Sequence, residues 1–217
     1  MHWRSGYGTK ARAWSGSRLW APRGVVAYDR LMAILHAATV TPTKLELLET
    51  WLPRQPWFSG PATNLIRVSG YRFDDPDGEV GLETLLVRSG DDGAVYQVPL
   101  SYRGAPLSNA DSYLVGTMEH SVLGPRWVYD AEGDPVYRAV LASVISGEAA
   151  QAEEFVDTHG ELVRRDTTMH VTGSGAVTGV PVIVRRLGDT GDSIAGLVGT
   201  WVGQTDPVTL VIVRALP

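Results

Sequence analysis

The run from Ala94 to Arg103 constrains the fold more than any other part of the sequence. Residues of different character alternate along it, which places them on opposite faces of a β-strand. One face carries Tyr96, Val98, Leu100 and Tyr102, and the other carries Gln97, Pro99, Ser101 and Arg103. Because proline has no N–H to donate to a ladder, Pro99 predicts that this strand is an edge strand or is bulged at that point.

Two further strand-like runs, residues 64–73 and 80–88, lead up to this strand, and turns rich in Asp and Gly separate the three runs. Together they predict an antiparallel meander, with residues 95–103 as the last strand of a first sheet. Ahead of the meander, residues 33–40 have the pattern of a short strand. A capping box formed by Thr43 and Glu46 then predicts the start of a helix.

The chain after residue 105 has a different pattern. A hairpin is expected over residues 117–130, and Asp134 with Pro135 predicts the start of the clearest helix. The acidic stretch 148–157 favours another helical turn or two. Four strand-like runs then follow, over residues 162–171, 180–187, 194–202 and 208–216. The sequence therefore predicts an α+β fold with two antiparallel β-sheets and a few flanking helices.

These patterns suggest three segments. Residues 1–31 show neither helical nor strand periodicity, which favours a disordered extension or a start codon placed too early, since Met32 opens the first patterned run. Residues 32–105 form the first predicted domain and residues 106–217 form a second α+β domain.

Composition limits the partners. The formal net charge of −5 argues against nucleic acid, and no apolar run approaches the roughly 20 residues that span a membrane. The chain has no cysteine, so disulfides and thiolate chemistry are absent. We expect a cytoplasmic protein, and the oligomeric state stays open.

The hairpin at residues 117–130 carries the candidate ligand-binding residues. With Leu123, Gly124 and Pro125 as its loop, Glu119 would face Tyr129 and lie on the same side as Trp127, with Arg126 nearby. Such a set could hold a sugar by ring stacking and hydrogen bonds. Ordinary cross-strand pairing explains the same four residues equally well, so both interpretations stay open.

Aromatic residues gather in a second place, the segment Trp51 to Gly60, which contains two tryptophans and a phenylalanine. We expect these rings to form a hydrophobic lid on the first sheet, with a ligand shelf as the alternative.

Three segments resemble motifs for calcium binding, phosphate binding and kinase catalysis, but each lacks residues that its motif requires. Residues 74–78 resemble a calcium loop, but Thr84 stands where the loop needs a Glu. The glycines at residues 173–179 lack the Gly-Lys-Ser/Thr ending of a phosphate loop. His159-Gly160-Glu161 echoes a kinase catalytic loop with Glu in place of Asp. We therefore assign no catalytic residue, no metal ligand and no cofactor, and leave weak ATP binding open.

Two motifs together carry a family resemblance. The segment Trp-Leu-Pro-Arg-Gln-Pro-Trp-Phe-Ser-Gly at 51–60, followed by Tyr-Gln-Val-Pro-Leu-Ser-Tyr-Arg at 96–103, resembles the N-terminal cap region of actinobacterial maltokinases. The block from Gly116 to Asp130 is similar to the same group. The resemblance covers roughly residues 33–150 and, more loosely, the C-terminal strands. It implies a cap-like domain at 32–105 and an intermediate-like domain at 106–217, without the kinase catalytic lobe.

Maltokinases use ATP to phosphorylate maltose, which feeds maltose 1-phosphate into α-glucan synthesis. The resemblance therefore implies a link to α-glucan (glycogen, trehalose) metabolism, and it leaves two hypotheses. The first is a non-catalytic accessory protein that binds a pathway enzyme or a sugar metabolite. The second is a complementing subunit of a sugar kinase, or a small enzyme of the pathway.

Overall fold

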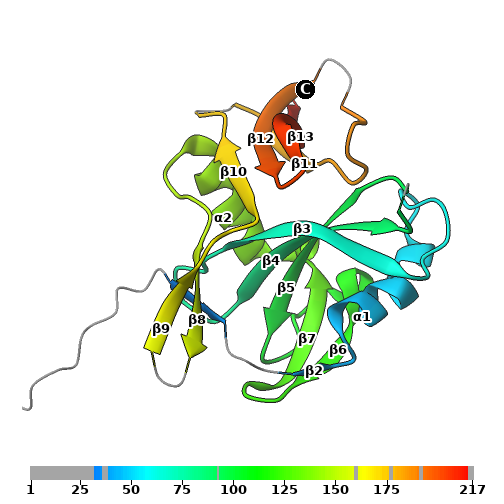
Figure 1. The fold of residues 1–217 in the computed structure, drawn as a ribbon, viewed down its shortest axis with the longest axis vertical. Coiled ribbons are helices and arrows are strands. Elements are labelled where there is room, and N and C mark those ends of the chain that lie inside the picture. Colours follow the sequence, from blue (N-terminus) through cyan, green and yellow to red (C-terminus); the bar gives the residue numbers. More distant parts are fainter. Residues whose placement is uncertain are drawn as a thin grey trace, which may run out of the picture.

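Two α-helices and three β-sheets make up the part of the chain that the computed structural model describes, residues 32–35, 39–91, 93–158, 161–175, 178–190 and 193–214 (Figure 1). The α+β class is confirmed, with three sheets in place of the two expected. The predictions for residues 1–31 and for the kinase-like echo at His159 and Gly160 lie outside the described residues.

The largest sheet has six strands in the order β2-β6-β7-β5-β4-β3, and all of its pairs are antiparallel. Its strands are β2 (Val40–Thr41), β3 (Leu65–Phe73), β4 (Gly81–Ser89), β5 (Tyr96–Arg103), β6 (Leu114–His120) and β7 (Gly124–Asp130). The predicted meander is confirmed as β3-β4-β5. The sheet continues through β7 and β6, so the expected boundary between residues 105 and 106 falls inside one sheet.

Strand β5 lies between β4 and β7 and is not the last strand of its sheet. Pro99 nevertheless lies at a position where the side of β5 away from β4 has no ladder partner. The N–H of Gln97 points away from β4 and donates to the Arg185 carbonyl over 2.8 Å. Two residues further on, the missing N–H of Pro99 would point the same way. The ladder with β7 begins only at Leu100. Pro99 therefore occupies the gap in which the outer edge of β5 changes partner.

The two smaller sheets match the sequence patterns in part, since the predicted strands at 180–187, 194–202 and 208–216 are present in one antiparallel sheet. Strand β1 (Met32–Leu35) pairs in parallel with β8 (Glu153–Thr158), which pairs with β9 (Glu161–Arg165). The four-stranded sheet β10-β12-β13-β11 holds β10 (Met169–Gly173), β11 (Val180–Ile183), β12 (Ile194–Trp201) and β13 (Gln204–Arg214).

Two strand predictions and one helix prediction are corrected here. The run 33–40 divides into β1 and β2 in different sheets, and the run 162–171 divides into β9 and β10. The acidic stretch ends as strand β8 and not as helix. Pairing with distant strands decides all three, and no local pattern reveals such pairing.

Both helices begin as predicted. Helix α1 (Lys44–Trp51) has the Thr43–Glu46 capping box and continues into the 3-10 helix η1 (Leu52–Arg54). Helix α2 (Pro135–Ser146) has Asp134 as its N-cap and ends at Gly147, whose φ of 83° is left-handed. Two further 3-10 helices are η2 (Asp111–Tyr113) and η3 (Ala131–Gly133).

Two apolar clusters cover the two faces of the six-stranded sheet. One packs beneath α1 and includes the alternating residues of β5. The other lies between the opposite face, α2 and the four-stranded sheet. The buried Gln97 joins the two sheets, since its side chain accepts from the Tyr71 hydroxyl and donates to the carbonyls of Val184 and Leu210.

Candidate functional site

The hairpin β6–β7 has a different register from the one predicted. Glu119 pairs with Pro125 and His120 with Gly124, so residues 121–123 form the turn and the predicted loop at 123–125 is wrong. The His120 imidazole Nδ1 accepts from the N–H groups of Val122 and Leu123, over 3.3 and 3.1 Å, and so stabilises the turn at residues 121–123.

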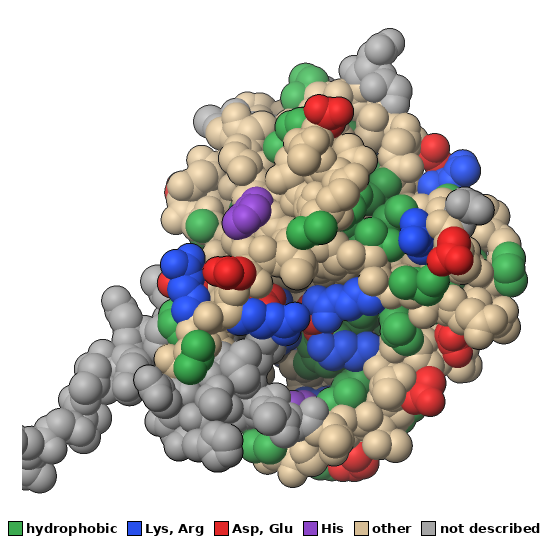
Figure 2. Space-filling view, in the orientation of Figure 1, with side chains coloured by type: hydrophobic (Ala, Val, Ile, Leu, Met, Phe, Trp, Pro, Cys, Tyr) green, Lys and Arg blue, Asp and Glu red, His purple; other side chains and the backbone are tan. Residues whose placement is uncertain are grey.

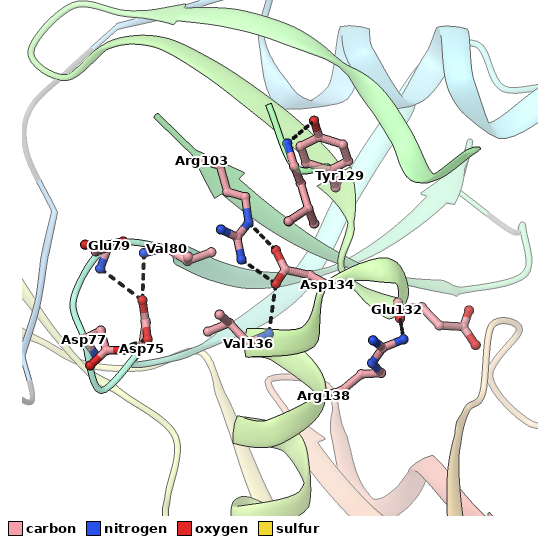
Figure 3. Close-up of polar contacts among 11 residues, drawn as sticks. Asp75, Asp77, Glu79, Val80, Arg103, Tyr129, Glu132, Asp134, Val136 and Arg138 are labelled. Atoms are coloured by element: carbon pink, nitrogen blue, oxygen red, sulfur yellow. Dashed lines mark hydrogen bonds and ion pairs between the residues drawn. The ribbon is translucent and has the colours of Figure 1, made fainter. Parts of the chain in front are cut away.

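The four candidate residues on this hairpin have different surroundings. Glu119 is exposed, whereas Tyr129 is buried and its hydroxyl accepts from the Leu107 N–H over 2.9 Å (Figure 3). Trp127 and Arg126 are half-buried, and the Arg126 guanidinium lies over Gly104, where a Cβ would be 2.8 Å from Nη1. Among the described residues, no hydrogen bond links any two of these four, and their ligand role stays a prediction.

A more densely organised group of charges surrounds Glu83 on the face of the sheet that packs against α1. The carboxylate is 2% exposed, forms an ion pair with Lys44 and accepts from the Tyr102 hydroxyl over 3.2 Å. Two arginines flank it, with Arg67 at 3.6 Å and Arg72 at 3.7 Å. We call Lys44, Arg67 and Arg72 the basic cluster. Figure 2 shows Lys and Arg side chains gathered in the hollowed middle of this face.

A β-bulge brings the two arginines onto one face. Strict alternation would place Arg67 and Arg72 on opposite faces of β3, because their positions differ by five, an odd number. The register of β3 against β4 shifts between Arg67 and Ser69, and this extra residue turns Arg67 to the side of Arg72. Gly70 completes the arrangement, since a Cβ there would lie 2.9 Å from Nη2 of Arg67. The guanidinium therefore occupies space that any larger residue would fill.

Electrostatics fix the charge state of the buried acid. Burial by itself would raise the pKa of Glu83, but the charges of Lys44 and Arg72 and the hydrogen bond from Lys44 outweigh it and lower the pKa to about 2. Burial lowers the pKa of Lys44, and the attraction of Glu83 offsets only part of that effect. Burial and the neighbouring Glu83 carboxylate raise the pKa of Tyr102 well above its ordinary value. Glu83 is therefore a fixed anion and Tyr102 a fixed hydrogen-bond donor.

A second polar group ties the sheet to α2. Arg103 donates from Nε and Nη2 to both carboxylate oxygens of Asp134, each over 2.7 Å, while Asp134 also caps the helix by accepting from the Val136 N–H (Figure 3). Burial would raise the pKa of Asp134, but the hydrogen bonds from Arg103 and Val136 and the positive charge of Arg103 lower it. This group holds the fold in place and keeps its carboxylate ionised.

Arg185 joins three parts of the molecule. Its Nη2 donates to Asp130 over 2.7 Å and to Glu132 over 2.6 Å. Its guanidinium carbon also lies 4.8 Å from the ring centre of Trp57. Trp57 in turn packs against the apolar cluster beneath α1, with its ring centre 5.7 Å from that of Trp51 and 6.2 Å from that of Tyr96. The predicted lid is therefore present at this segment.

A groove of about 830 Å³ lies between the β3–β4 turn, α2 and the start of β8. Val136 and Val140 line it together with the acidic residues Asp74, Asp75, Asp77, Glu148 and Glu153. Asp75 is buried and accepts from the N–H groups of Asp77, Glu79 and Val80, so its carboxylate shapes the turn (Figure 3).

The fold and its charge groups define an α+β module in which a short helix covers one face of an antiparallel sheet, and the buried acid Glu83 on that face is bound by Lys44 and flanked by two arginines. Residues 51–134 match the family model of the maltokinase N-terminal cap domain, so this segment of the chain is similar to that domain. The match spans β3 to β7 and ends at Asp134, which confirms the resemblance carried by the sequence motifs. No curated protein matches the chain.

Proposed function

We propose that the protein is a non-catalytic accessory protein of α-glucan metabolism, which uses its maltokinase-type cap domain to bind a pathway enzyme or a sugar metabolite in the cytoplasm. The family match supports the link to maltokinases. No described helix has the length and apolar character to cross a bilayer.

The non-catalytic part of the proposal rests on the contacts that the buried carboxylates make. Four carboxylates are buried among the described residues: Asp75, Glu83, Asp130 and Asp134. Each one is bound to cations or to backbone N–H groups that stabilise the fold. A general base or metal ligand for phosphoryl transfer must instead present its oxygens to the reactants.

An assay with ATP and maltose tests this proposal. The purified protein is incubated with both compounds and Mg²⁺, alone and with an extract of the native cell, and phosphorylated sugar is measured. We expect no product above the protein-free control from the protein alone. Product from the protein alone would refute the non-catalytic role, and product that requires both the protein and an added partner would favour the complementing subunit. A pull-down from the native cell should then identify the partner.

A further inference from the structure

We propose that the basic cluster of Lys44, Arg67 and Arg72 is a binding site for the phosphate group of a small phosphate monoester, with Glu83 as the anion that holds the site together. The argument rests on charge, free donors and geometry, and it is independent of the proposed accessory function.

The charge of the cluster matches that of a phosphate monoester. Three cations surround the Glu83 carboxylate, which leaves an excess of two positive charges around it, and the half-buried Asp74 near Arg72 is a second anion that offsets part of this excess. A phosphate monoester carries about −1.5 to −2 charges at neutral pH. One such ligand would neutralise the excess, whereas a monoanion would leave part of it in place.

The arginines also have unused hydrogen-bond donors. Lys44 and Tyr102 both contact Oε2 of Glu83, while the two arginines approach the carboxylate only to 3.6 and 3.7 Å. These distances allow attraction but no hydrogen bond. Within the described ranges, neither guanidinium donates a hydrogen bond to another residue. Guanidinium groups match the geometry of phosphate oxygens, because their N–H groups form a rigid fork.

The cationic side chains of the basic cluster are accessible to solvent. The side chains of Arg67, Lys44 and Arg72 are 43%, 29% and 18% exposed, whereas that of Glu83 is 2% exposed. The acid therefore lies beneath its three partners, and an incoming anion meets the cations first.

Local structure holds the cations in place before any ligand arrives. The bulge in β3 and the absence of a side chain at Gly70 set the position of Arg67, and Arg72 lies opposite Glu83 in the ladder with β4. Lys44 occupies the first turn of α1, where the helix dipole disfavours a cation, and the ion pair with Glu83 offsets that cost. A preorganised site of this kind loses little side-chain freedom on binding.

The size of the cluster favours a small ligand over a nucleic acid. Backbone recognition of nucleic acid needs a basic stripe that contacts many phosphates. Here the excess positive charge sits in one place, and acidic residues line the groove around the β3–β4 turn and α2. A single phosphate group fits this distribution.

Isothermal titration calorimetry on the full chain at low salt and about pH 8 tests the site. Methyl phosphate is the dianionic probe and dimethyl phosphate the monoanionic one. We expect saturable binding of methyl phosphate, with at least about tenfold weaker binding of dimethyl phosphate and a clear loss of affinity with added NaCl. Arg67→Gln and Arg72→Gln should each weaken methyl phosphate binding by about tenfold or more. Arg138→Gln is the matched control, because Arg138 is exposed on α2 outside both candidate binding sets, and it should leave binding within about twofold.

Circular dichroism confirms that each variant is folded, and the partly exposed Arg67 makes its variant the safer of the two. Equal affinity for both probes would overturn the proposal, as would affinity lost in Arg138→Gln but kept in Arg67→Gln, or no saturation up to about 10 mM methyl phosphate. Inorganic phosphate and glucose 1-phosphate distinguish the sources of the phosphate group. Tighter binding of glucose 1-phosphate supports a sugar phosphate as ligand, and equal binding supports phosphate recognition alone.

Discussion

Replacement of Glu83 by Gln removes the one anion among three cations and tests how the cap domain is held together. The pKa of Glu83 is about 2 in the folded protein, against an ordinary value of 4.5. A carboxyl group with a lowered folded pKa stabilises the protein above its unfolded pKa, and this stability is lost as the pH falls through the folded pKa. The difference between these two pKa values stabilises the folded protein by about 3 kcal/mol at pH 7 and by about 1.5 kcal/mol at pH 3.

Glu83→Gln cannot ionise, so it lacks this contribution at every pH. The lowered pKa already contains the attraction between Glu83 and the three cations, which stay protonated between pH 3 and 7, and any rearrangement around the unpaired cations adds a further cost that does not vary in this range. The burial cost of Lys44 is equally constant in this range. We expect a loss of about 3–5 kcal/mol at pH 7, which shrinks by about 2 kcal/mol at pH 3.

Urea denaturation of the variant and the unmodified protein at the two pH values measures this difference. Glu119→Gln is the matched control, since its carboxylate is exposed on the same sheet, and it should change the free energy of unfolding by less than about 0.5 kcal/mol at either pH. An equal loss for Glu83→Gln at pH 7 and pH 3 would contradict the assignment of Glu83 as the buried anion of the cluster.

Three further predictions concern stability. Trp57→Ala should cost about 2–4 kcal/mol in urea denaturation, since the half-buried ring contacts Trp51 and Tyr96 and supports Arg185, and an unchanged value with lost ligand binding would favour the shelf. Asp134→Ala should cost about 3 kcal/mol by the same method, and Asp134→Asn less, because asparagine still caps α2 but cannot pair with Arg103 as an anion. A chain beginning at Met32 should melt within a few degrees of the full chain by calorimetry, and a loss of cooperative folding would refute the view that residues 1–31 are dispensable.

Local chemistry made several elements predictable. The capping box of α1 and the Asp134-Pro135 start of α2 act within one helical turn, so the sequence contains all the information that they need. The alternation in β5 places its apolar side chains in the cluster beneath α1, and Pro99 marks the gap between two edge partners. These features depend on neighbours along the chain or on the missing N–H of one residue.

Features set by distant partners were less predictable. Nothing near residues 33–40 or 162–171 shows that each run divides between two sheets, because the partners of β1 and β10 lie far away in sequence. The hairpin register depended on one imidazole that accepts two N–H groups from the turn. An error of two residues in the turn was enough to change the partners of Glu119 and Trp127.

The charge group around Glu83 shows where sequence reasoning could have gone further and where it could not. A lone acid within the apolar run from Gly81 to Val87 is a signal of a buried, paired carboxylate, since such groups are almost never buried alone. Its partners were not readable in the same way. Strict alternation separates Arg67 from Arg72, and only the bulge between Arg67 and Ser69, together with the space over Gly70, places both beside Glu83. One extra residue in a strand thus decides whether this sheet carries two isolated arginines or a basic cluster able to receive an anion.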